Sequence, residues 1–161
     1  MQELLDIEEI KRLKARYFRL LDHKLWTEFE QLFTADFMFF SVHAVGVVPT
    51  VPLATSGRAF VTRLVAMTEG CTTAHYGHMP EIEVTGDRAH GIWAMQDIVE
   101  HPSDNGMRFV GAGHYHDDYV REPEGWRIER STLIRIRIDP LPKPEADGVA
   151  ALRIAGQGSA P

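Results

Sequence analysis

The sequence predicts an α+β fold, with helices near its start and an antiparallel β-sheet in its second half. Three long runs of β-type pattern, at 88–100, 107–121 and 126–139, are separated by segments rich in turn-forming residues. Apolar residues near the start instead recur at the spacing of one helix face: Ile7, Ile10, Leu13, Tyr17 and Leu20. Helical and extended segments are thus segregated along the chain, which is typical of the α+β class.

The apolar stripe at the start predicts two helices, at about 6–21 and 25–33. Asp6 and Glu9 have the spacing of a capping box, so we expect the first helix to begin there. The pattern is interrupted at Asp22, where we expect a sharp junction. The basic residues of the first helix are expected on its other faces: Lys11, Arg12, Lys14 and Arg16.

The middle of the chain predicts a third helix at about 57–68, for which Ser56 is a suitable N-cap. Prolines favour a loop over 45–54. Three short extended segments complete the expected sheet, at 37–42, 72–76 and 81–84.

Length and composition favour one globular domain of 161 residues, which we place at 1–139, followed by a tail at 140–161 that is frayed or lies on a neighbouring subunit. The formal net charge of −6, without a basic stripe, argues against nucleic-acid binding. No apolar run is long enough for a membrane span, and the acidic start has no signal-peptide core. A single cysteine, Cys71, excludes a disulfide framework within the chain. We therefore expect a cytoplasmic protein.

Two carboxylates occupy unusual positions. Alternation along 88–100 places Asp97 on an apolar face together with Trp93 and Met95. A buried carboxylate needs a partner or water, so Asp97 is either a structural ion-pair member or part of a polar pocket. Asp22 follows the apolar stripe and either bonds nearby backbone N–H groups or orients a histidine. Tyr17 lies on the same stripe, as a core residue or as a buried hydroxyl donor.

Two histidines and one arginine of the expected strands also have more than one interpretation. His114 and His116 share one strand face with Asp118, a spacing compatible with metal ligands, but no further ligand cluster accompanies them and no metal is predicted. Alternation in 126–139 puts Arg135 with Leu133 on the face opposite the isoleucines, although a bulge would reverse this assignment. A surface position for Arg135 is the alternative. The sequence lacks nucleotide-binding glycine loops, a Gly-x-Ser-x-Gly elbow and a His-Glu-x-x-His motif.

Several segments resemble the SnoaL-like branch of the nuclear transport factor 2 (NTF2) superfold. The resemblance covers about residues 5–35 and 72–138, including the helix around Tyr17 and Asp22 and the segment His75-Tyr-Gly-His-Met-Pro-Glu-Ile. It is strongest to bile-acid 7α-dehydratases and more distant to scytalone dehydratases and hexachlorocyclohexane dehydrochlorinases. It implies three helices packed on a strongly curved antiparallel sheet, forming a cone-shaped pocket. It also implies five catalytic positions, matched here by Tyr17, Asp22, His75, Asp97 and Arg135.

The chemistry that this resemblance implies is a β-elimination that needs no cofactor. A neutral imidazole is available near pH 7, so His75 is expected to be the general base and Asp22 to fix its tautomer. Tyr17 and Arg135 are expected to donate hydrogen bonds to developing negative charge, and Asp97 to position or protonate the leaving hydroxyl. Residues expected to line a site for a hydrophobic substrate are Phe18, Trp26, Phe39, Trp93, Met95, Phe109 and His114.

The substrate class stays open at this stage. A hydroxysteroid is the first expectation, and an aromatic lyase of retro-aldol or formaldehyde-releasing type, an isomerase or a polyketide cyclase is the alternative. The superfold also hosts binding modules without catalysis. We expect a homo-oligomer formed through the uncovered sheet face, a trimer or else a dimer, which light scattering would test.

Overall fold

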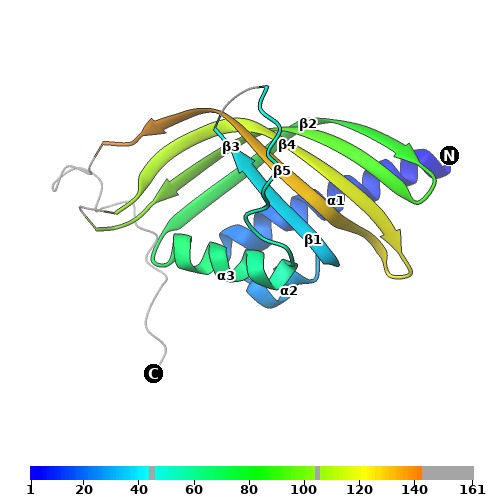
Figure 1. The fold of residues 1–161 in the computed structure, drawn as a ribbon, viewed down its shortest axis with the longest axis horizontal. Coiled ribbons are helices and arrows are strands. Elements are labelled where there is room, and N and C mark those ends of the chain that lie inside the picture. The colour runs from blue at the N-terminus through cyan, green and yellow to red at the C-terminus, as the bar shows by residue number, and fades with distance from the viewer. Residues whose placement is uncertain (44–45, 104–105, 143–161) are drawn as a thin grey trace.

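The computed structural model describes residues 1–43, 46–103 and 106–142, and the rest of the expected tail, from residue 143, lies outside the described residues. Helices lie against one face of a strongly curved sheet (Figure 1). In chain order the elements are α1 (Gln2–Asp22), α2 (Trp26–Glu30), β1 (Phe33–Val42), α3 (Gly57–Thr68), β2 (Thr72–Thr85), β3 (Arg88–Glu100), β4 (Arg108–Glu122) and β5 (Gly125–Pro140). The expected α+β class is confirmed. No helix among these described residues is both long and apolar enough to cross a membrane.

The five strands form one open sheet in the order β1-β5-β4-β3-β2. The three pairings among β2, β3, β4 and β5 are antiparallel, as expected. The pairing of β1 with β5 is parallel, so the expectation of a wholly antiparallel sheet is wrong at this edge. Because the chain reaches β5 only after the β2–β4 meander, β1 can occupy the far edge beside β5.

The core fills the space between the helices and the concave face of the sheet. Aromatic rings from α1, α2, α3 and β1 meet there, and the ring centroids of Phe39 and Phe60 are 4.3 Å apart. The α1 helix runs along the sheet (Figure 1) and presents to it Ile10, Leu13, Tyr17, Phe18 and Leu21. This packing fixes the end of α1 over the strands that carry the candidate site.

The start of α1 differs from the expected capping box. The helix begins at Gln2, so Asp6 lies in its second turn. The buried Asp6 carboxylate accepts hydrogen bonds from Gln2 and Trp126 and pairs with Arg121 at 2.6 Å. Hydrogen bonding to Arg121 is the largest cause of a lowered pKa of Asp6. Asp6 therefore ties α1 to β4 and β5 and does not cap the helix.

The α3 helix agrees with the sequence prediction, whereas β2 is longer than predicted. The α3 helix has the expected limits, and Ser56 accepts a hydrogen bond from the backbone N of Ala59 at 3.1 Å. The two short segments expected at 72–76 and 81–84 are instead one strand, β2, whose pairing shifts between His78 and Glu81. A bulge absorbs the extra residues, so the strand continues through Pro80.

Two further shifts in register occur between β4 and β5. They place Ile128 and Leu133 on the same, concave face although their positions differ by five, an odd number, while Ile134 faces outward. Arg135 pairs with Gly113 and therefore points toward the concave side. The placement of Arg135 opposite Ile128 was thus wrong, and the bulge is the reason.

Candidate active site

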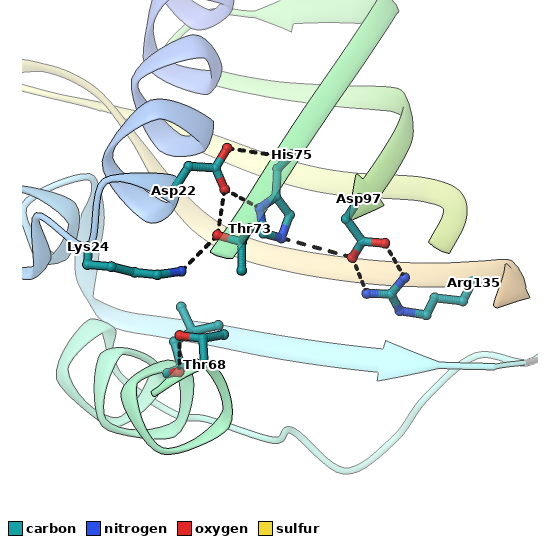
Figure 2. A network of polar contacts seen from close by, with 8 residues as sticks. Asp22, Lys24, Thr68, Thr73, His75, Asp97 and Arg135 are labelled. Carbon is teal, nitrogen blue, oxygen red and sulfur yellow. Dashed lines mark hydrogen bonds and ion pairs between the residues drawn. The ribbon is translucent and has the colours of Figure 1, made fainter. Parts of the chain in front are cut away.

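The end of α1 brings Asp22 against β2 at the position of His75. The Nδ1 atom of His75 lies 2.6 Å from Oδ1 of Asp22, and the backbone N of His75 donates to Oδ2 at 2.8 Å (Figure 2). An ionised carboxylate only accepts hydrogen bonds, so the imidazole proton belongs on Nδ1. The carboxylate therefore fixes both the tautomer and the orientation of the ring.

Two residues that the sequence analysis did not single out complete the environment of Asp22. The hydroxyl of Thr73 donates to Oδ1 of Asp22 at 2.9 Å, and Nζ of Lys24 donates to the same hydroxyl at 2.7 Å. Lys24 follows α1 in the left-handed conformation, with φ of 58°. Burial lowers the pKa of Lys24, although the charges of Asp22 and Cys71 oppose this shift. The Asp22 carboxylate is thus held from three sides.

On the other side of the ring, β3 and β5 contribute a second carboxylate and a second cation. Nε2 of His75 lies 3.9 Å from Oδ2 of Asp97, which is beyond hydrogen-bond distance. Both Asp97 oxygens accept from the guanidinium of Arg135, one of them from NH1 at 2.9 Å (Figure 2). Burial disfavours the charged guanidinium, but the hydrogen bonds and charge of Asp97 outweigh it and raise the pKa of Arg135. Both oxygens of Asp97 are therefore engaged by Arg135.

The pair of Asp97 and Arg135 lies directly over a glycine of β4. A Cβ atom added to Gly111 would collide with the guanidinium of Arg135 and with Oδ1 of Asp97. Gly111 is the register partner of Asp97 in the neighbouring strand. The absence of a side chain at this position makes room for the ion pair.

The four polar residues are largely closed to solvent. The side chains of His75 and Arg135 are 9% and 12% exposed, that of Asp97 is 1% exposed, and that of Asp22 is 19% exposed. Two hollows on the surface lie elsewhere, one beside the start of α1 near Arg121 and one between α1, α2 and the β4–β5 turn. Neither of these two hollows is lined by His75.

Tyr17 is buried in the core. Its side chain is 1% exposed and its ring packs against Phe29 and Tyr115, with centroids 4.9 and 5.9 Å away. Burial raises the pKa of both Tyr17 and Tyr115. Tyr115 is in turn influenced by the charges of Asp97 and Arg135. Tyr115, which was not expected from the sequence, packs against Tyr17 and lies on β4, the strand that also carries Gly111 beneath the ion pair.

The apolar residues expected to contact substrate divide into two groups. Three lie beside the polar cluster: Met95 is two residues before Asp97 on the same face, Phe109 lies 5.5 Å from the Arg135 guanidinium, and Phe18 packs against Gly77. The ring of Trp26 is 5.8 Å from Nζ of Lys24.

The remaining two are occupied in the core. Phe39 stacks on Phe60, and Trp93 donates a hydrogen bond to the hydroxyl of Tyr119 at 2.9 Å.

His114 does not belong to this site. It pairs with Ala94 and Ile134, and strand alternation puts its side chain on the outer face of the sheet, opposite Tyr115. The expected substrate contact of His114 is therefore wrong, because the alternation of β4 was assigned without knowing which face is covered. Among the residues that the structure describes, no group of three or more His, Cys, Asp or Glu side chains is arranged to hold a metal ion.

A second buried polar cluster lies beneath Tyr17. Nζ of Lys14 is 2.6 Å from Oδ2 of Asp117, and both side chains are fully buried. The hydroxyl of Tyr119 donates to the same oxygen at 2.9 Å, and the ammonium lies 3.7 Å from the ring centroid of Tyr115. Lys14 thus faces the core, and the expectation that it lies on a different face from the apolar stripe is wrong. Its spacing, four residues after Ile10, was the available signal.

The fold and the polar cluster define the class of protein. A helix-packed, curved, unclosed sheet with an imidazole held between two carboxylates is an arrangement suited to acid–base chemistry on a small molecule. The family model of the SnoaL-like domain matches residues 2–132, and the chain belongs to this family.

Solved structures with the same fold include three that illustrate its range. A scytalone dehydratase candidate from Novosphingobium aromaticivorans has a TM-score of 0.73 at 19% identity, covering 92% of this chain and 95% of its own. A type 2 hexachlorocyclohexane dehydrochlorinase (LinA) has a TM-score of 0.73 at 15% identity, covering 91% and 97%. The protein Kfla4162 from Kribbella flavida has a TM-score of 0.75 at 20% identity, covering 85% and 95%. The expected NTF2-like fold is therefore confirmed.

Proposed function

We propose that the protein is a lyase that catalyses β-elimination, most simply dehydration, with His75 as the general base. The observation that carries the proposal is the hydrogen bond from Nδ1 of His75 to Asp22 at 2.6 Å, which leaves the lone pair on Nε2. That nitrogen faces the side of the ring on which Asp97 and Arg135 lie. A substrate C–H bond placed there would meet a base and a cation together.

The elimination needs only the substrate and the side chains of the protein, and every proton and electron pair is accounted for. Nε2 of His75 takes a proton from the carbon next to a carbonyl or vinylogous carbonyl, and Asp22 stabilises the imidazolium that forms. The electron pair of the broken C–H bond becomes the new C=C bond as the C–O bond to the leaving hydroxyl breaks. The imidazolium returns its proton to the departing hydroxide, which leaves as water.

Arg135 is the candidate for stabilising developing negative charge on the substrate. Its guanidinium has five N–H donors, and Asp97 uses two of its nitrogens. Asp97 holds the guanidinium in place, which is a positioning role rather than the proton donation considered from the sequence. Tyr115 and Tyr17 extend the polar cluster away from His75 toward the core.

The substrate class is proposed from the side chains around the cluster and from the family. Phe18, Met95 and Phe109 favour a hydrophobic ring system. A hydroxysteroid is the first choice, in keeping with the resemblance to bile-acid 7α-dehydratases, and the names of two structural neighbours, a dehydratase and a dehydrochlorinase, are those of eliminating enzymes.

A screen of hydroxylated steroids and lignin-type aromatics, read by mass spectrometry, tests the proposal. Loss of water by wild type but not by His75→Ala supports a dehydratase, whereas loss of formaldehyde would support the aromatic lyase. His114→Ala is the matched control, because it removes an imidazole from the outer face of the sheet. Tight binding of ring compounds without any conversion would favour a binding module and overturn the proposal.

A further inference from the structure

The charges around His75 form two opposed pairs. Asp22 on α1 and Asp97 on β3 flank the ring, with oxygens 2.6 Å from Nδ1 and 3.9 Å from Nε2. Negative charges beside an imidazole favour its protonated form, which cannot act as a base. Each carboxylate, however, has a cation on the side away from the ring. Arg135 binds Asp97 directly, and Lys24 reaches Asp22 through the hydroxyl of Thr73.

The connection through Thr73 is directional. Its oxygen accepts from the ammonium of Lys24 and donates its only proton to Oδ1 of Asp22, the same oxygen that faces Nδ1 of His75. Hydrogen bonds in such a chain polarise one another. The ammonium of Lys24 therefore strengthens the hydrogen bond from Thr73 to the Asp22 carboxylate. A stronger donor on Oδ1 withdraws electron density that this oxygen would otherwise offer to the imidazolium.

The backbone at the end of α1 positions the Lys24 side chain for its contact with Thr73. Lys24 has a positive φ of 58°, an uncommon conformation for a residue with a side chain, directly where α1 ends. The Lys24 backbone N donates to the carbonyl of Leu21 at 3.2 Å, and the turn directs the side chain back over Thr73 (Figure 2). Thr73 is itself buried on β2, two residues before His75.

We propose that Lys24 and Thr73 are positioning residues that hold the Asp22 carboxylate and offset its charge, so that the lone pair on Nε2 of His75 stays available as a base. The inference rests on the proposed function and assigns to it two residues that do not touch the reacting atoms. The charged and titratable groups around this system are Asp22 on α1, Lys24 in the turn that follows α1, Cys71 just before β2, Asp97 on β3, Tyr115 on β4 and Arg135 on β5.

The test follows the imidazole of His75 directly by ¹⁵N NMR over a range of pH, so it does not require a known substrate. In Lys24→Met, the pH at which His75 is half protonated is expected to rise by about 0.5–1 pH unit relative to wild type. Thr73→Val is expected to shift it in the same direction and to mix the two neutral tautomers. Thr73→Ser keeps a hydroxyl and should restore the wild-type titration and the Nδ1–H tautomer.

Lys11→Met is the matched control for the loss of one positive charge. Lys11 lies on the same helix in an exposed ion pair with Glu8 and should leave the titration unchanged. If Lys24→Met and Thr73→Val lower the thermal stability but leave the protonation midpoint and tautomer of His75 as in wild type, the two residues are structural only and the proposal is wrong. If no substrate is ever turned over but the shifts occur, the proposed function fails while this charge balance stands.

Discussion

Asp22 holds His75 twice, because one oxygen of its carboxylate accepts from Nδ1 at 2.6 Å and the other accepts from the backbone N at 2.8 Å. The second bond couples the end of α1 to the main chain of β2. Movement of either element would therefore misplace the ring. The asymmetry of the imidazole, with one nitrogen bound and the other facing Asp97, follows from this single carboxylate.

Asp22→Asn tests the tautomer argument. The amide retains the shape of the side chain, but its NH₂ group can donate to Nδ1 and would favour the opposite tautomer, with the proton on Nε2. We expect kcat to fall by roughly 10⁴-fold, as for the corresponding exchange in hydrolase triads, with the circular dichroism spectrum unchanged. Steady-state kinetics on the substrate found in the screen provides the measurement. A fall of less than about tenfold would mean that Asp22 does not set the tautomer.

Gly111→Ala tests the need for space beneath the ion pair of Asp97 and Arg135. The added methyl group overlaps both side chains, so at least one must move. Because a misplacement of about 1 Å can cost roughly 10²-fold in rate, we expect kcat/KM to fall by roughly 10- to 100-fold. Ala112→Ser, on the outer face of the same strand, is the control. Equal activity of the two variants would show that the ion pair is not needed.

Lys14→Met tests the buried ion pair with Asp117. Removing the ammonium leaves a carboxylate buried without its charge partner, so the free energy of unfolding should fall by about 3–5 kcal/mol. The double variant Lys14→Met/Asp117→Leu should be more stable than the single variant, because no charge is then left buried. Urea unfolding measures both, with the exposed Lys11→Met expected to change stability by less than about 1 kcal/mol. A single variant as stable as wild type contradicts the assignment.

Alkaline stability depends on three buried tyrosines. Burial raises the pKa of Tyr17, Tyr115 and Tyr119 above the ordinary value of 10.0. The unfolded chain then releases protons that the folded chain keeps, so the stability contributed below pH 10 is lost as pH rises beyond it. Burial also lowers the pKa of Lys14. This shift makes folding stability rise with pH, but only up to pH 10.5, the ordinary pKa of a lysine.

Above about pH 10.5 the tyrosines therefore govern the pH dependence, and stability should decrease. An ultraviolet titration near ~295 nm follows the ionisation of phenol groups. The absorbance of the three buried phenols should appear only together with the loss of far-ultraviolet circular dichroism, separately from that of the exposed Tyr76. Ionisation of all four tyrosines in the folded protein would contradict this account.

Local patterns in the sequence were sufficient for most elements and for the face occupied by Asp97. Period-two alternation reports which residues share a face, provided that the register is unbroken. It placed Arg135 correctly with Leu133 but wrongly opposite Ile128, because the bulges of β5 leave no clear signal in the sequence. It also left open which face the helices cover, and His114 was assigned to the wrong face for this reason.

The partners of the site residues depend on contacts between distant segments. Thr73 and Asp22 are 51 residues apart, and Lys14 and Asp117 are 103 apart, so neither pair follows from local spacing. The pairing of Asp22 with His75 was expected only from the resemblance to a known family. The parallel pairing of β1 with β5 likewise follows from the chain path and not from either strand alone.

The central claim is that His75 removes a proton from carbon, and its most direct test is exchange with solvent deuterium. In D₂O, wild type should catalyse elimination together with incorporation of deuterium at the deprotonated carbon of recovered substrate, and His75→Ala should lower the rate of both by roughly 10²- to 10⁴-fold. The variant should retain the wild-type circular dichroism spectrum. Near-wild-type rates in a folded His75→Ala protein would contradict the account.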